Sequence, residues 1–308
     1  MRDARKHHYI PRSYLGNFGN SNGKVFRINT IDIDNKNKFK TNVENVASEK
    51  DFYKLKTADD PLVIEKFLSG IEGNTKRAIN YIEKYQEIPN DDLFDYMINF
   101  IACLAVRVPK KRNQTEKTIT DVYERVMALC LFDEKRWNTI IERVKKDNEN
   151  LPNVDYKEVK KFFDEKRYKL DISQDYLVGN FLKMASTICD LLPSRNWGLV
   201  QSECPRGFIT SDNPVILTWT KDHFMKNRPP GYGLLGTTVR LPITPQFLLI
   251  GTYEPLKKLS IFNIKQVAAT NTLIKMYADR YLFYSDRSYY WFDGDKVHDG
   301  PDAYLRER

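Results

Sequence analysis

Residues 7–18 read His7-His8-Tyr9-Ile10-Pro11-Arg12-Ser13-Tyr14-Leu15-Gly16-Asn17-Phe18. This stretch holds two of the four histidines of the chain and sets them close to two tyrosines, an arginine and an asparagine. Proline and glycine interrupt it, so it is too short and too punctuated to be a simple helix. We therefore expect the fold to be organised around this stretch and the functional site to include it.

Strands and turns are predicted next to this opening. Residues 19–23 have the composition of a turn, and residues 24–28 alternate apolar and polar side chains as a half-buried strand does. The pattern predicts that the opening is one arm of a hairpin. Residues 32–42 are polar, and we expect them to form an exposed loop.

Helices are predicted between residues 61 and 190. Pro61 suits a first helical position, and apolar residues then recur at helical spacing. A second helix begins after the Asn90-Asp91-Asp92 cap and runs to Arg107, before Pro109. Its interior, residues 97–106, is almost entirely apolar, which predicts the central core helix. Further helices are expected at residues 115–131, 134–148, 155–169 and 174–192.

The last third of the chain is typical of a β-sheet. Turn residues separate strand patterns at 198–202, 207–210, 215–219, 238–241 and 246–251. A helix at 263–277 and a closing hairpin of 281–285 with 289–293 follow. Because strands bracket the helices, we expect the N-terminal hairpin to join the C-terminal sheet. The prediction is an α+β fold with a mixed or antiparallel sheet, built as one composite domain from residues 1–57, 58–195 and 196–308.

Composition favours a globular protein without stabilising disulfides. The 308 residues are 41% hydrophobic and 13% aromatic, which argues against disorder. Four cysteines lie far apart with no Cys-x-x-Cys spacing, which disfavours a zinc site and predicts reduced thiols in the cytoplasm. No apolar segment follows Met1, and no run of about 18 apolar residues occurs, so neither a secretory signal nor a membrane span is expected.

The net charge of +8 comes from 49 basic and 41 acidic residues spread along the chain. A folded chain that gathers these charges on one face would attract a polyanion such as nucleic acid. The plainer interpretation is a soluble, lysine-rich protein without that partner.

Four stretches together resemble a bacterial family known as domain of unknown function 4238. They are the opening, Asp51-Phe52-Tyr53, the pair Glu65 and Glu72, and Ile209-Thr210-Ser211-Asp212-Asn213-Pro214. The resemblance runs from residue 7 to about residue 215 and continues more weakly to Asp286. Because the family has no established activity, the resemblance indicates the fold, the place of the site and a bacterial accessory role such as defence, but no reaction.

His7 and His8 point to opposite faces if they lie in a strand, so at most one of them would face a given site. That histidine could act as a general base, a metal ligand or a phosphate contact. Alternatively, it bonds backbone groups and holds the N-terminus in the sheet. Tyr9, Arg12 and Asn17 are the neighbouring candidates for substrate binding.

Ser211-Asp212-Asn213-Pro214 follows a short apolar strand, where ligand-binding side chains often protrude. Asp212 could bind a metal or fix the tautomer of a histidine, and Ser211 and Asn213 could contact substrate. The alternative is turn chemistry, in which these side chains bond nearby backbone. Ser211 is a weak candidate for a nucleophile because the Gly-x-Ser-x-Gly motif is absent.

Glu65 and Glu72 lie seven residues apart, on the same side of a helix. With a histidine and Asp212 they would suit a hard divalent ion, Mg²⁺ or Mn²⁺. Two such glutamates are more often a solvated surface. Arg107 is expected to be a buried arginine that pairs with one of these carboxylates or with a phosphate, or else to cap the end of its helix.

The missing motifs narrow the choice of reaction. The sequence has no phosphate-binding loop, no dinucleotide-binding glycine motif and no His-Glu-x-x-His. The polar set and the basic charge therefore predict a hydrolase, a phosphodiesterase that acts as a nuclease, with a possible metal ion. The alternative is a non-catalytic module that binds a nucleotide, a nucleic acid or a protein.

Overall fold

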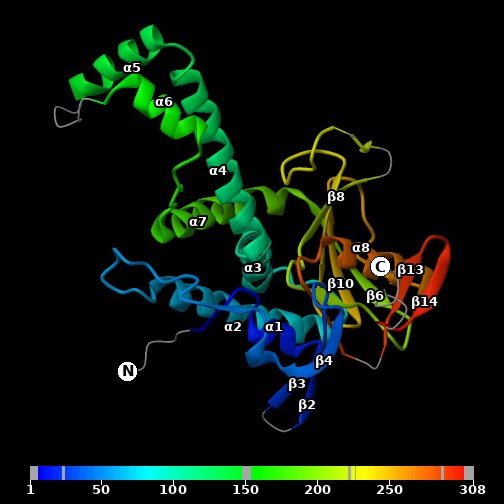
Figure 1. Cartoon of the computed structure of the whole chain (residues 1–308). Coiled ribbons are helices and arrows are strands. Elements are labelled where there is room, and N and C mark those ends of the chain that lie inside the picture. Colours follow the sequence, from blue (N-terminus) through cyan, green and yellow to red (C-terminus); the bar gives the residue numbers. More distant parts are fainter. Residues whose placement is uncertain are drawn as a thin grey trace.

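The computed structural model describes residues 6–22, 25–147, 154–220, 223–225, 227–285 and 288–301. Within these ranges helices and several β-sheets occur together, which confirms the α+β fold (Figure 1). The described helices include none that is both long enough and apolar enough to cross a membrane. All four cysteines are free.

The last third of the chain forms a five-stranded sheet in the order β11-β6-β10-β9-β8. Its strands are β6 (Asn196–Ser202), β8 (Ile216–Trp219), β9 (Thr237–Pro242), β10 (Phe247–Thr252) and β11 (Leu259–Phe262). All pairs are antiparallel except β11 with β6. Every residue of β10 is buried, because this strand lies in the middle of the sheet and carries a continuous apolar run.

A second sheet joins the two ends of the chain. It contains β2 (Asn20–Asn22), β3 (Val25–Asp32), β4 (Asn37–Asn42), β7 (Thr210–Ser211) and β12 (Tyr281–Tyr284). β12 pairs antiparallel with both β3 and β7, so Thr30 lies opposite Phe283 and Ser211 opposite Leu282. The prediction that N-terminal strands join the C-terminal part in a sheet is confirmed. Residue 24, the first of the predicted strand, lies outside the described residues.

The opening differs from the predicted hairpin arm. β1 (Lys6–His8) pairs antiparallel with β5 (Ser48–Lys50), and a short helix, α1 (Arg12–Gly16), follows directly. Pro11 precedes this helix with an extended conformation, which suits a residue at a helix start. The partner of β3 in the N-terminal hairpin is β2 instead.

Two other predictions of local structure are wrong. Residues 37–42 form strand β4 at the edge of the second sheet, not a loop. The strand at 290–293, β13 (Tyr290–Asp293), pairs with β14 (Lys296–Asp299), because β12 is already occupied on both sides by β3 and β7. Polar edge strands and long-range pairing both leave little trace in local sequence periodicity.

The helices lie between the two chain segments that form the sheets. They are α2 (Val63–Tyr85), α3 (Asp92–Val106), α4 (Pro109–Cys130), α5 (Glu134–Asp147), α6 (Tyr156–Asp164) and α7 (Gln174–Leu191), with α8 (Ile264–Tyr277) near the end. The Asp91 side chain caps α3 by accepting the Leu93 N–H, and residues 100–106 are all buried, as predicted for the core helix. α4 starts earlier and α6 ends earlier than predicted. Residue 148, at the predicted end of α5, is outside the described residues.

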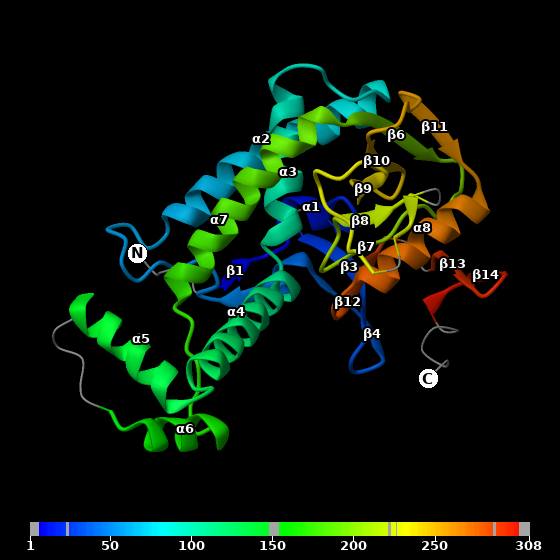
Figure 2. The same ribbon diagram turned by 90° about the horizontal axis from the view of Figure 1, so that it is seen from above.

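One large hydrophobic core connects the opening, the helices and the first sheet. It includes Leu15 from α1, Ile79 from α2, Ile101 from α3 and Leu249 from β10. In contrast, α4 extends away from this body and carries α5 and α6 at its far end (Figure 2). Trp137 is the buried residue of α5, and none is buried in α4 or α6. The boundaries of the three predicted segments stay a prediction.

Candidate functional site

His7 and His8 lie on opposite faces of β1, as their positions in a strand predict. The His7 side chain is buried, with 1% of its surface exposed. Its Nδ1 accepts the Tyr53 N–H at 2.9 Å, and its ring stacks on the Tyr53 ring with centroids 5.9 Å apart. Because Nδ1 is the acceptor, Nε2 carries the proton of the neutral ring. Nε2 lies 3.4 Å from Glu65 Oε2, outside hydrogen-bond geometry.

His8 lines a cleft instead. Its Nε2 has no hydrogen-bond partner among the described residues. Burial lowers the pKa of His8 below its usual value, and the Arg12 charge lowers it further, although a hydrogen bond with the Glu44 backbone raises it. Because Nε2 is free, Nδ1 makes that hydrogen bond and Nε2 keeps its lone pair in the neutral ring. His8 is therefore neutral at pH 7, and its basic nitrogen Nε2 is buried and has no partner among the described residues.

The cleft has a volume of about 390 Å³. Its wall combines β1, α1, Tyr53 and one face of α2, and its residues are His8, Arg12, Ser13, Tyr53, Glu65, Leu68, Ser69, Glu72, Gly73 and Lys76. The α2 contribution is a stripe at positions 65, 69, 72 and 76, which share one side of a helix. Both predicted glutamates line the cleft, together with two cations and a neutral histidine.

Arg107 lies behind Glu72 and is not itself a wall residue of the cleft. Its Nη1 donates to Glu72 Oε1 at 2.9 Å, and its Nε donates to the Tyr9 carbonyl at 2.9 Å. Its own carbonyl accepts the Tyr53 O–H at 3.2 Å. Burial opposes the charged guanidinium, but the charge and hydrogen bond of Glu72, together with Tyr53 and Cys103, outweigh it, so the pKa of Arg107 is raised. The predicted pairing of a buried arginine with one of the two glutamates is confirmed, and the pair ties α3 to β1 and α2.

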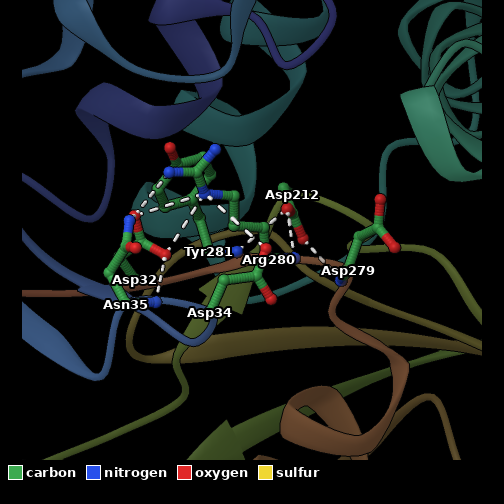
Figure 3. Close-up of polar contacts among 7 residues, drawn as sticks. All are labelled: Asp32, Asp34, Asn35, Asp212, Asp279, Arg280 and Tyr281. Carbon is green, nitrogen blue, oxygen red and sulfur yellow. Dashed lines mark hydrogen bonds and ion pairs between the residues drawn. The ribbon is translucent and has the colours of Figure 1, made fainter.

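Asp212 lies in a closed network at the start of β12 (Figure 3). One carboxylate oxygen accepts the Asp279 N–H at 2.8 Å, and the other accepts the N–H groups of Arg280 at 2.8 Å and Tyr281 at 2.9 Å. Only 4% of Asp212 is exposed, and burial raises its pKa to about 6 despite these three donors. Beside it, Arg280 pairs with Asp32 at 2.7 Å. Asp212 thus fixes the turn between α8 and β12.

The neighbours of Asp212 in the sequence also bond backbone groups. Ser211 Oγ accepts the Asn213 N–H at 3.2 Å, and Asn213 Nδ2 donates to the Tyr277 carbonyl at 2.8 Å. Asn17 Nδ2 donates to the Ile243 carbonyl at 3.1 Å. These contacts are the turn and packing chemistry that we gave as the alternative to substrate binding.

Tyr9 and Tyr14 link the opening to the Asp212 region. The Tyr14 hydroxyl lies 2.7 Å from Thr210 Oγ1 and donates to the Pro242 carbonyl at 2.6 Å. Burial raises the pKa of Tyr9, and the Asp212 charge adds to this effect. The opening and the Thr-Ser-Asp-Asn-Pro stretch therefore meet as predicted, but through buried tyrosines, and Asp212 is not part of the wall of the cleft.

The sequence of the chain matches the family model described as protein of unknown function (DUF4238) over residues 6–288. The chain belongs to this family. No curated protein and no solved structure matches it.

The stretches that carried the family resemblance fall into two places in this member. The opening, Tyr53 and the two glutamates gather at the cleft, whereas residues 209–214 build the closed network around Asp212. In this chain these stretches therefore serve both a polar cleft and the support of the fold.

Two further parts of the site were missed by the sequence analysis. Lys76 and Ser69 line the cleft from the same face of α2 as the glutamates, and their spacing of four residues from Glu72 and Glu65 could have revealed them. In the described ranges, no three His, Cys, Asp or Glu residues lie close enough together to hold a metal ion. The Mg²⁺ or Mn²⁺ site with Glu65, Glu72 and Asp212 stays a prediction.

Proposed function

We propose that the cleft is the active site of a phosphodiesterase that cleaves nucleic acid, with His8 as its general base. The observation that carries this proposal is the buried, unpartnered Nε2 of His8, a residue that lines the cleft together with Arg12 and Lys76. Attack on a phosphodiester requires a base that accepts the proton of the nucleophile and cations that stabilise the charge on the phosphate. His8, Arg12 and Lys76 would supply these groups in one cleft.

The state of His8 suits proton abstraction. A general base must be unprotonated at working pH, and the lowered pKa of His8 meets this condition. The hydrogen bond from Nδ1 to the Glu44 backbone orients the ring and leaves Nε2 without a partner. Nε2 would take a proton from water or from a ribose hydroxyl once a bound substrate displaces the side chains that bury it.

Arg12 and Lys76 would bind the phosphate. Arg12 pairs with Glu44 at 3.4 Å, but both side chains are more than half exposed. Such a surface pair contributes little, so a phosphate can replace it at low cost. The net charge of +8 favours the approach of a polyanion.

Glu65 and Glu72 have a secondary place in this proposal. Glu72 is held by Arg107, whereas Glu65 lies beside His7 with 35% of its side chain exposed. If the reaction uses Mg²⁺ or Mn²⁺, Glu65 is the carboxylate of the cleft best able to reach it, because Glu72 is paired with Arg107. Asp212 lies outside the cleft wall and has both oxygens engaged.

The test is cleavage of single- and double-stranded DNA and RNA by the wild type, His8→Ala and the control His298→Ala. His298 lies on β14 near Asp293, outside the cleft. We expect cleavage by the wild type and the control, with the rate of His8→Ala reduced by about 10²-fold or more. Parallel reactions with Mg²⁺, Mn²⁺ or EDTA determine whether a metal takes part. Cleavage that survives in folded His8→Ala would reject the role of His8.

A non-catalytic binding module is the second candidate. It is favoured by the extent to which His7, Glu72 and Arg107 are already used in contacts within the protein. In this case no substrate is cleaved under any condition, and oligonucleotides or nucleotides bind in a manner that depends on Arg12 and Lys76. Fluorescence anisotropy with labelled oligonucleotides, on the same variants, separates the two candidates.

A further inference from the structure

The first sheet has an outer strand with one open edge. Among the described strands β11 pairs with β6 only, and it forms one border of the five-stranded sheet (Figure 2). The carbonyls of Lys258 and Phe262 accept N–H groups from the β6 side. Because alternate residues of a parallel strand bond the same neighbour, the even-numbered residues of β11 face β6. The backbone N–H and C=O groups of Leu259 and Ile261 therefore point away from the sheet.

Two other edge strands of the protein are protected. At β8, the opposite border of the same sheet, the Tyr277 hydroxyl donates to the Leu217 carbonyl at 2.7 Å. β4, at the edge of the second sheet, carries exposed Lys38 and Lys40, and lysines within a strand discourage edge pairing. β11 reads Leu-Ser-Ile-Phe and has neither a charged residue nor a proline. In the described ranges no side chain bonds its outer backbone groups, so this edge stays open.

The side chains of β11 carry an apolar surface out to this edge. Phe262 lies on the face of the sheet that α8 covers, and it packs against a core cluster that includes Val267 of α8. Because alternate side chains of a strand point to opposite faces, Leu259 and Ile261 share the other face. They are 37% and 62% exposed. The open backbone edge is thus bordered by two exposed apolar side chains.

The charge along this edge is unequal. From residue 255 to residue 278 the sequence contains four lysines and no acidic residue. Lys257 and Lys258 are exposed and directly precede β11. At the other end, exposed Glu203 donates its N–H to the Phe262 carbonyl, and exposed Lys265 lies in the first turn of α8. The edge therefore has a positive start and a balanced end.

We propose that β11 is the docking edge for an extended segment of another protein, in which apolar residues alternate with polar ones and an acidic residue lies beside Lys257 and Lys258. The segment adds a strand to the sheet and bonds the outward N–H and C=O groups of Leu259 and Ile261. Its apolar side chains pack on those of Leu259 and Ile261 across the new pair.

A second copy of this chain complements the edge less well. Antiparallel pairing of Leu259 with Ile261 of a second copy would bring the lysine pair to the balanced end of that copy. That end offers no net negative charge, whereas an acidic segment does. The charge along the edge therefore favours a different protein as the partner.

The test uses the full chain and a fluorescently labelled peptide of alternating valine and threonine with two glutamates at each end. Fluorescence anisotropy should show saturable binding with a Kd of about 10–100 µM, the range of a small transient interface. The same peptide with lysines in place of the glutamates should bind about tenfold more weakly or worse. Lys258→Gln should weaken binding of the glutamate peptide, and Lys117→Gln, an exposed lysine of α4, should not.

Ile261→Pro separates the edge from the rest of the sheet. Proline removes the outward N–H and no bond to β6, and it is tolerated at edge positions of this kind. The variant should keep the circular dichroism spectrum of the wild type and lose about tenfold or more of the affinity. Ile261→Thr keeps the N–H and the β-branched shape, so it should retain more of the binding.

Four results would overturn the proposal. No saturable binding of the glutamate peptide to the wild type, or unchanged affinity in folded Ile261→Pro, would reject the docking edge. Equal binding of the lysine peptide, or an unchanged Kd in Lys258→Gln, would reject the acidic partner. If sedimentation shows a dimer that Ile261→Pro abolishes, the edge belongs to a second copy instead. Nuclease activity does not enter this test.

Discussion

His8 and Asp212 were predicted to belong to one site, and the structure uses them in opposite ways. His8 lines an open cleft and keeps a ring nitrogen without a partner. Asp212 is sealed in the protein, and its two oxygens accept three backbone N–H groups. Both are polar residues in stretches that carried the family resemblance, so the resemblance alone does not separate function from support. The difference lies in the hydrogen-bonding capacity that each side chain has left.

Among the residues that support the fold, Arg107 should be the one whose substitution lowers the free energy of unfolding most. Arg107→Met removes the partner of Glu72 and the donor to the Tyr9 carbonyl, and leaves a carboxylate only 23% exposed. Breaking a buried pair in this way should lower the free energy of unfolding by about 3–5 kcal/mol. Urea denaturation followed by circular dichroism measures the loss. A loss below about 1 kcal/mol would show that Arg107 serves ligand binding more than folding.

Asp212→Ala should come next. It leaves three partly buried N–H groups without an acceptor, and we expect a loss of about 3 kcal/mol in the free energy of unfolding. The control is Asp279→Ala, in which an exposed carboxylate of the same turn is removed and the backbone N–H is kept. If Asp212→Ala has the same free energy of unfolding as this control but loses activity, Asp212 takes part in function and does not only support the fold.

The pH dependence of stability tests the sealed state of Asp212 directly. Its pKa is about 6 in the folded protein against 3.8 in the unfolded chain, so the folded state binds the proton more tightly. This contribution to stability is complete below pH 3.8 and is lost as the pH rises through 6. Relative to Asp212→Asn, the wild type should therefore lose about 2 kcal/mol between pH 4 and pH 7. A constant difference across this range would contradict the buried, raised pKa.

The smallest expected effect concerns His8 at the cleft. The charge of Arg12 lowers the pKa of His8, so Arg12→Gln should raise that pKa without unfolding the protein. Because Arg12 is 60% exposed, solvent screens the interaction and the shift should be small. An NMR titration of the His8 ring protons measures it, with Arg27→Gln as a control on β3. If the pKa of His8 is unchanged in Arg12→Gln, the side chains of Arg12 and His8 are too far apart to bind the same phosphate.

The sequence predicted those parts of the fold that have a local pattern. The capped and apolar α3 was recognised because both its cap at Asp91 and its burial are encoded within the helix. β4 was missed because four of its six residues are exposed, so no alternation of apolar side chains marks it. The β13–β14 hairpin was missed because the pairing of β12 depends on strands far away in the sequence.

The same distinction applies to the site. Helical spacing predicted that Glu65 and Glu72 share a face, and a buried arginine before Pro109 predicted a carboxylate partner, which is Glu72. The surroundings of Asp212 could not be predicted, because its donors are backbone groups 67–69 positions away and carry no residue preference. For locating the cleft, polar side chains that share one face of a predicted helix were therefore more informative than the polar motif before Pro214.

The pairing of β3 with β12 has a consequence for how the protein is made. Asp32 and Arg280, which bond across this pair, are 248 positions apart. During synthesis β3 leaves the ribosome long before its partner exists, and contacts this distant in sequence form slowly. The second sheet must therefore assemble late in translation or after it. Until then the edge of β3 that later pairs with β12 lacks its partner, and unpaired strand edges promote aggregation.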